Sequence, residues 1–238
     1  AGTSTAALGF GGYLPSPFST ATEAYNGTSW TTLSATLATG TGHMHGSGTA
    51  VSALSAGGAT STAGAVATSY EFNNTINAIT QSSWSNGGNL NTARRFLGGT
   101  GTATAGLVFG GFQTSPGTNN AESEEYNGSS WSNETDFATQ RMNMFGSAGT
   151  QTAGLIFGGS GSVNTESYDG SSWSEVNNLP TGLSNARGNG TQTAALSMGG
   201  ETPAPAITDA TSEWDGSNWT SGGSMLFPGS KMGAFGTQ

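Results

Sequence analysis

The 238-residue sequence contains no cysteine, few charged side chains and no long apolar run. Without cysteine the chain has no disulfide bond, no thiol nucleophile and no cysteine-ligated zinc site. This absence leaves the compartment open, because many extracellular proteins have no disulfides. No apolar segment approaches the roughly 20 residues of a transmembrane helix, and the N-terminal residues do not resemble a signal peptide. We therefore expect a soluble chain that does not insert into a membrane.

Charge is scarce as well, and it is mainly negative. Five Lys and Arg stand against 14 Asp and Glu, which gives a formal net charge of −9. A surface that binds nucleic acid needs a dense basic patch. The cations are instead spread along the chain, at Arg94, Arg95, Arg141, Arg187 and Lys231. We expect neither nucleic acid nor anionic membrane as a partner.

The chain is rich in Gly, Ser and Thr, but an internal repeat argues against disorder. The segment TAGLIFGGSGSVNTESYDGSSW, residues 152–173, has a counterpart in each of five units. The Gly pairs of these units begin at Gly11, Gly57, Gly110, Gly158 and Gly199, at intervals of 46, 53, 48 and 41 residues by subtraction. Repeats of about 40 to 50 residues are typical of β-propeller blades.

Each unit reads as four short strands. In the unit that begins at Asn143, NMFGSAGT fits a crowded inner strand, and TAGLIFGG is an apolar strand ended by two glycines. Two further strands flank Asp169-Gly170, a dipeptide that favours tight hairpin turns. An aromatic pair surrounds each such turn and should fill the space between blades; the pairs are Tyr25 with Trp30, Phe72 with Trp84, Tyr126 with Trp131, Tyr168 with Trp173, and Trp214 with Trp219.

These patterns predict one all-β domain over residues 1–238, a five-bladed propeller with four antiparallel strands per blade. A sheet buries its faces only against neighbouring sheets, so five copies stacked radially form one body. The chain begins close to a second strand, TAALGFGG, and ends with KMGAFGTQ, which resembles the first strand NMFGSAGTQ. We expect the N- and C-terminal strands to pair and close the ring.

An apolar run ending in Gly-Gly, then an aromatic residue before a turn, then a Trp together resemble the kelch repeat. The resemblance covers nearly the whole chain and implies a propeller, although kelch propellers usually have six or seven blades. The Arg that commonly follows the Trp is only partly kept, near Arg94, Arg141 and Arg187. The sequence pattern GTQTAGLIFGG followed by TESYDGSSW is also similar to the Gly/Ser/Thr-rich kelch-like arrays of marine bacteriophages, including cyanophages. This second resemblance implies a virion component.

The segments between the Gly pairs and the third strands differ in length and content, and variable loops on a fixed scaffold often carry binding. In kelch propellers this connection lies on the same face as the one that follows the fourth strand. By this resemblance six residues are candidates for binding a ligand or partner, with ordinary variable loops as the alternative: Tyr13, Phe18, Phe112, Arg94, Arg95 and Arg141.

Other candidate chemistry favours a structural interpretation. His43 and His45 are two residues apart, so on a strand they would face the same side and could bind a metal ion together. No repeated carboxylate accompanies them. We therefore expect two histidines that face solvent or the channel. Glu23, Glu124 and Glu166 precede the aromatic residue by two positions, and Glu213 precedes it by one. Such repeated acids more often form a structural hydrogen bond than a glycosidase pair. We expect no enzyme activity, no cofactor and no metal.

Three functions remain open at this point. The first is a non-catalytic structural or host-attachment module of a phage virion, on the tail, a fibre or the capsid exterior, with other virion proteins or a host glycan as partner. The second is a soluble, multivalent carbohydrate-binding lectin with one site per blade. The third is a small hydrolase with a lone acidic cluster. The first two place the protein on the virion or outside the cell.

Overall fold

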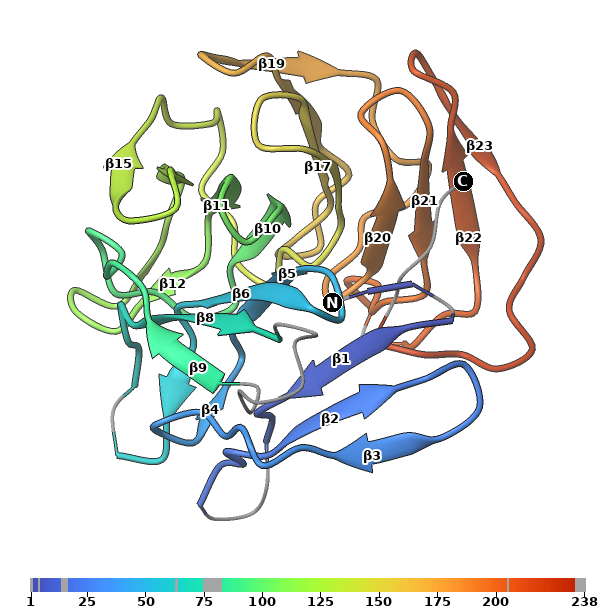
Figure 1. Cartoon of the computed structure of the whole chain (residues 1–238). Coiled ribbons are helices and arrows are strands. Elements are labelled where there is room, and N and C mark those ends of the chain that lie inside the picture. The colour runs from blue at the N-terminus through green and yellow to red at the C-terminus, as the bar shows by residue number, and fades with distance from the viewer. Residues whose placement is uncertain are drawn as a thin grey trace.

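The computed structural model of the chain describes residues 2–3, 5–13, 17–62, 64–74, 83–204 and 206–233. The regular elements in this part of the chain are all strands. They form five antiparallel sheets of three or four strands, which surround a common axis as a five-bladed β-propeller (Figure 1). No helix suited to crossing a membrane occurs in these ranges.

The sheets are called blades 1 to 5 in chain order. Blade 1 contains β1 (Ala7–Phe10), β2 (Thr22–Tyr25) and β3 (Trp30–Thr32). Blade 2 contains β5 (His45–Gly48), β6 (Ser52–Ala56), β8 (Ser69–Asn73) and β9 (Ser83–Asn86). Blade 3 contains β10 (Gly98–Gly101), β11 (Gly106–Phe109), β14 (Ser123–Tyr126) and β15 (Trp131–Asn133). Blade 4 contains β16 (Ser147–Gly149), β17 (Gly154–Phe157), β18 (Thr165–Tyr168) and β19 (Trp173–Val176). Blade 5 contains β20 (Arg187–Gly190), β21 (Ala195–Met198), β22 (Thr211–Trp214) and β23 (Trp219–Ser221).

The predicted fold class is confirmed, with four strands in blades 2 to 5. Neighbouring innermost strands contact one another around the axis, namely β5 with β10, β10 with β16, and β16 with β20. Two short strand pairs lie outside the blades, β4 (Thr41–Gly42) with β7 (Ala59–Thr60), and β12 (Phe112–Gln113) with β13 (Thr118–Asn119).

The Gly pairs turn the chain at the end of each second strand. In blade 3, Gly110 and Gly111 have φ angles of 61° and 102°, which side chains with a Cβ rarely adopt. A Cβ on Gly110 would also overlap Met144 Sδ and the Arg141 carbonyl oxygen. The N–H of Gly111 donates to that carbonyl oxygen at 2.9 Å, and the second glycine of every other pair donates to the equivalent carbonyl. The pairs therefore join each blade to the segment that follows its fourth strand.

The five aromatic pairs lie opposite each other in the register of the third and fourth strands. Their ring centroids are 4.8 to 5.4 Å apart. In four blades the Trp indole N–H donates to a Ser or Thr hydroxyl at the start of the third strand of the preceding blade; the donors and acceptors are Trp84 to Thr22, Trp131 to Ser69, Trp173 to Ser123, and Trp219 to Thr165. The predicted inter-blade packing is thus present in these four blades, and each contact also satisfies a polar group.

The fifth member of this series, Trp30 of blade 1, behaves differently. Its side chain is 51% exposed, whereas Trp131 and Trp219 are nearly buried. Buried hydrophobic clusters fill the four interfaces from blade 1 to blade 5 in chain order. Among the described residues, no such cluster joins blade 5 to blade 1. Within the described part of the chain, Trp30 thus lacks the buried surroundings that the other four Trp residues of this series have.

The hairpins at the outer edge are longer than the sequence predicts. Tyr168 pairs with Trp173, so four residues rather than two connect the strands of blade 4. Asp169 Oδ1 accepts the backbone N–H groups of Ser171 and Ser172 at 2.9 and 2.8 Å, which holds the loop in shape. These bonds, with one from the Ser171 hydroxyl as the largest influence, lower the pKa of Asp169 to about 2. The glycine of the dipeptide does take the left-handed region, with a φ of 92°.

Most of the expected closing segment, KMGAFGTQ at residues 231–238, lies outside the described residues, which end at Gly233. The part up to Gly233 repeats the geometry of the other connections. Lys231 has a φ of 56°, as His43 does, and Phe96, Asn143 and Asn185 have φ angles of 56° to 58° at the equivalent positions. The N–H of Gly200 donates to the Gly229 carbonyl oxygen at 2.7 Å, which is the fifth copy of the Gly-pair bond. Up to Gly233 the chain after blade 5 thus has the same backbone features as the connections after blades 1 to 4.

Candidate binding site

The two kinds of connection that the sequence assigns to one face do meet there. This face, called the loop face, holds the connections after the second and fourth strands. The N–H of Gly12 donates to the Thr41 carbonyl oxygen at 2.9 Å. Strand β4 pairs with β7, and Arg95 forms an antiparallel bridge with Phe112. The expectation about the shared face is confirmed.

Aromatic rings from blades 1 and 2 and from the segment that leads to blade 3 gather on the loop face. Tyr13 and Phe18 have ring centroids 5.2 Å apart. His43 lies next, 6.0 Å from Tyr13 and 6.2 Å from Phe18. Phe96 follows, 4.6 Å from His43. These distances are those of tilted and edge-to-face aromatic contacts, so the rings form one connected row.

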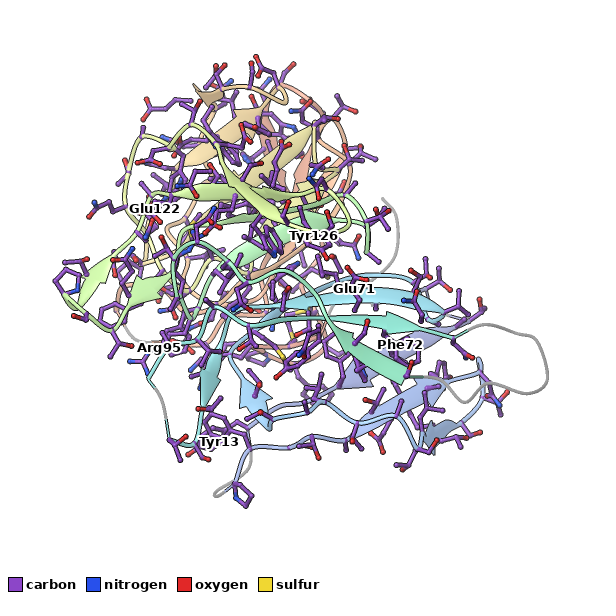
Figure 2. All side chains as sticks on the ribbon, turned by 60° about the vertical axis from the view of Figure 1, so that its left-hand side comes forward. Tyr13, Glu71, Phe72, Arg95, Glu122 and Tyr126 are labelled. Carbon is purple, nitrogen blue, oxygen red and sulfur yellow. The ribbon has the colours of Figure 1, made fainter. Side chains whose placement is uncertain are left out.

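Arg95 extends this row toward blade 3. Its guanidinium carbon lies 5.2 Å from the centre of the Phe96 ring and 5.3 Å from the centre of the Phe112 ring, within cation–π range. The row is called the aromatic strip and consists of Tyr13, Phe18, His43, Phe96, Arg95 and Phe112. Figure 2 shows Tyr13 and Arg95 on the same side of the molecule.

The aromatic strip is partly open to solvent. Tyr13 is 66% exposed, and the other five side chains are half-buried. Desolvation lowers the pKa of His43, and the charges of Arg95 and Lys231 lower it further, so the imidazole is neutral at pH 7. The strip therefore offers ring faces and one cation, an arrangement that can pack against the apolar face of a sugar and donate hydrogen bonds to its hydroxyls.

Two of the six predicted binding residues occupy a different place. Arg94 and Arg141 are fully buried, where Arg94 contacts Glu124 at 2.6 Å and Arg141 contacts Glu166 at 2.5 Å. Each guanidinium also donates to two backbone carbonyl oxygens of the blade that its chain is about to enter. Both side chains point into the protein, where their hydrogen bonds and ion pairs hold the connection against the next blade. Arg94 and Arg141 are therefore structural residues and do not belong to the candidate site.

The partner acids are the repeated glutamates for which the sequence favours a structural role. Glu124 and Glu166 hold the buried arginines, whereas Glu23 and Glu213 are exposed. Blade 5 has neither partner, with Leu183 and Ser212 at the equivalent positions. Arg and Glu thus occur together in blades 3 and 4 and are both absent in blade 5. Glu23 of blade 1 has Gly229 at the arginine position, but it is exposed, so the buried glutamates are the ones that have an arginine partner.

The two histidines do not form the strand pair that the sequence pattern implies. His45 begins β5, but His43 precedes the strand with a φ of 56°. Both line a cavity on the propeller axis, as the channel-facing alternative predicts. No cluster of three or more His, Cys, Asp or Glu suited to a metal ion occurs within the described ranges.

Stability should depend on pH through His45. Desolvation, with a smaller effect of the Arg187 charge, lowers the pKa of His45 to about 3 in the folded chain. An unfolded His titrates near 6.5, so below that pH the unfolded state binds a proton that the folded state does not. We expect the free energy of unfolding to fall by about 1 to 2 kcal/mol from pH 7 to pH 5. The fall is no larger because part of the His45 surface is accessible to solvent, which weakens the effect of burial.

Urea unfolding of the wild type and of His45→Asn at both pH values measures this contribution. The variant should lose most of the pH dependence, with a small remainder of the same sign from His43. An unchanged pH dependence in the variant would show that His45 is not the group responsible.

Two members of the aromatic strip, His43 and Phe96, are not found as binding residues by sequence reasoning. Each occupies the left-handed position after the fourth strand, where the other units have Asn or Lys. An aromatic ring at this repeated position is the sequence feature that could have identified both residues as members of the site. Arg187 is also misplaced by the repeat pattern, because it lies on β20 and faces the axial cavity rather than the connection.

Comparison with models of known protein families finds no match for this chain. Comparison with curated proteins likewise finds no similar sequence.

Proposed function

We propose that this protein is a non-catalytic attachment module, a kelch-like propeller that binds a surface glycan with the aromatic strip. One observation carries the proposal: six side chains from four connections form a continuous row on the loop face, and Tyr13 at its end is 66% exposed. A row of contacting rings that reaches the surface is more informative than a single exposed ring, because contiguous apolar patches mark binding surfaces.

A glycan fits the chemistry of the strip better than a nucleic acid does. Stacked rings contact the apolar face of a sugar, and Arg95 supplies several N–H donors for hydroxyl oxygens. Phosphate-backbone binding would need many free cations. Arg94 and Arg141 form buried ion pairs, and the Lys231 ammonium lies 3.7 Å from the Glu201 carboxylate, so three of the five cations already have acidic partners.

We place this module on the exterior of a phage virion, where it attaches the particle to a host glycan and contacts other virion proteins. Support for this placement is the resemblance of GTQTAGLIFGG and TESYDGSSW to the kelch-like arrays of marine bacteriophages. A cysteine-free fold held by inter-blade packing also works without regard to redox conditions.

The alternative, a soluble multivalent lectin, predicts an equivalent site in every blade. The residues that follow the five Gly pairs are Tyr13, Ala59, Phe112, Ser160 and Glu201. Only two of them are aromatic, and both belong to the one aromatic strip. The row is therefore a single feature on a repeated scaffold, which favours one site per chain.

A glycan-array screen, followed by calorimetric titration of the strongest sugar, tests the proposal. We expect one site per chain, and the Tyr13→Ala variant should weaken binding by about fivefold to tenfold, since a stacked ring contributes about 1 kcal/mol. The matched control is Trp30→Ala, which removes another exposed ring at the opposite face. Five sites per chain would favour the lectin, and a folded wild type that binds no glycan would refute glycan recognition.

A further inference from the structure

The axial cavity has a volume of about 490 Å³, in the size range of sites that hold small molecules. Its lining comes largely from the innermost strands β5, β10, β16 and β20 and is rich in glycine, because inner strands crowd the axis. His43 belongs both to this lining and to the aromatic strip, so the cavity and the strip adjoin.

Arg187 is the charged residue of the described lining. Its guanidinium carbon lies 4.3 Å from the centre of the Phe145 ring, and its Nε donates to the Met232 carbonyl oxygen. Among the described residues the two Nη atoms have no hydrogen-bond partner and no carboxylate partner. Desolvation lowers the pKa of Arg187 to about 10, so the group still carries its charge at pH 7. Arg94 and Arg141, the other two enclosed arginines, each have a glutamate.

The cavity is free of acids in a strongly acidic protein. None of the described lining residues is Asp or Glu, and none of the residues outside the described ranges is acidic by sequence. The negative charge therefore lies away from the axis, while Arg187 lies on it. A fixed cation in a low-dielectric recess attracts an anion more strongly than the same cation at an open surface does.

Neighbouring polar groups also offer donors. Asn189 Oδ1 accepts the Gly190 N–H at 2.7 Å, which leaves the Asn189 amide N–H groups unused among the described residues. The Ser47 hydroxyl also lines the cavity without a described partner. A planar guanidinium with two free Nη atoms matches a carboxylate, which accepts two parallel hydrogen bonds.

We propose that the axial cavity binds the carboxylate of an acidic sugar, with Arg187 as its anchor and Asn189 as a second donor. The choice of a sugar rests on the proposed function, because the adjoining aromatic strip would contact the neutral rings of the same glycan. The cavity thus selects uronic acids among the sugars that the strip can hold.

Calorimetric titration with glucuronate, glucose and inorganic phosphate tests this proposal on the full chain. Glucuronate should bind at least about tenfold more tightly than glucose, and Arg187→Gln should remove that preference. Asn189→Asp keeps the acceptor for the Gly190 N–H but adds a negative charge, so it should abolish glucuronate binding even if Arg187→Gln fails to fold. Lys231→Asn, which also removes one positive charge, should change the affinity by less than about twofold, because Lys231 is exposed and paired with Glu201.

The outcomes separate this proposal from the proposed function. Glucuronate binding that needs Arg187 but not Tyr13 supports the cavity and contradicts the strip. Glycan binding that needs Tyr13 and is unchanged in Arg187→Gln supports the strip and overturns the cavity. Phosphate binding tighter than glucuronate binding overturns the assignment to a carboxylate.

Discussion

Replacing Arg141 with leucine is expected to lower the free energy of unfolding by about 3 to 5 kcal/mol. The variant leaves the Glu166 carboxylate buried without its cation, and the Gly158 and Asn164 carbonyl oxygens lose a donor. The Ala138 N–H, which donates to Glu166 at 2.8 Å, would be one of the few groups left to stabilise the carboxylate. Denaturant unfolding followed by Trp fluorescence measures the loss.

Blade 5 supplies a matched rescue for this variant. Combining Arg141→Leu with Glu166→Ser reproduces the Leu183 and Ser212 of that blade and should restore stability to within about 1 to 2 kcal/mol of the wild type. Lys231→Asn breaks the exposed pair with Glu201 and should cost less than about 1 kcal/mol. If the double variant is no more stable than Arg141→Leu, the buried Glu166 carboxylate without its cation is not the cause of the loss.

Trp219→Ala should be about as destabilising, at roughly 3 to 5 kcal/mol, whereas Trp30→Ala should cost about 1 kcal/mol or less. The Trp219 ring lies 4.8 Å from Phe157 and 5.4 Å from Trp214, and its indole N–H donates to Thr165. Trp30 occupies the equivalent position in blade 1 but is 51% exposed. The two variants remove the same side chain from the same place in the repeat, so they compare a buried, hydrogen-bonded Trp with an exposed one.

Denaturant unfolding of both variants under identical conditions gives the comparison. A loss for Trp30→Ala as large as that for Trp219→Ala would mean that Trp30 is buried in the folded protein, and would contradict the exposed position that separates the two residues.

Much of the fold can be predicted from the sequence because the same local signals recur in each repeat. A Gly pair marks where every second strand ends, and the spacing from Tyr168 to Trp173 sets a hairpin register that recurs in blades 1, 3 and 5. Blade 2 keeps the aromatic pair but has a longer connection between Phe72 and Trp84. The loop length between those residues is less evident, since the Asp169 side chain stabilises a four-residue loop that a dipeptide rule does not foresee.

The candidate site is only partly visible in the sequence because its members meet across blades. Tyr13, Phe18 and Phe112 stand out as rings in variable loops, but the contact of His43 with Phe96 joins residues 53 positions apart by subtraction. The same limit misplaces Arg141. Its partner Glu166 lies 25 residues later, in the next blade, so the sequence shows a cation near a loop and not the ion pair that buries it.

Hydrogen–deuterium exchange with and without a bound glucuronate-containing tetrasaccharide tests the central claim, that this propeller recognises glycans with one site on its loop face. The account predicts slower exchange on binding in residues 11–13, 94–97 and 112–119, and no change in the hairpins at 127–130 and 169–172 on the opposite face. Protection confined to those hairpins, or spread equally over all five blades, would contradict it.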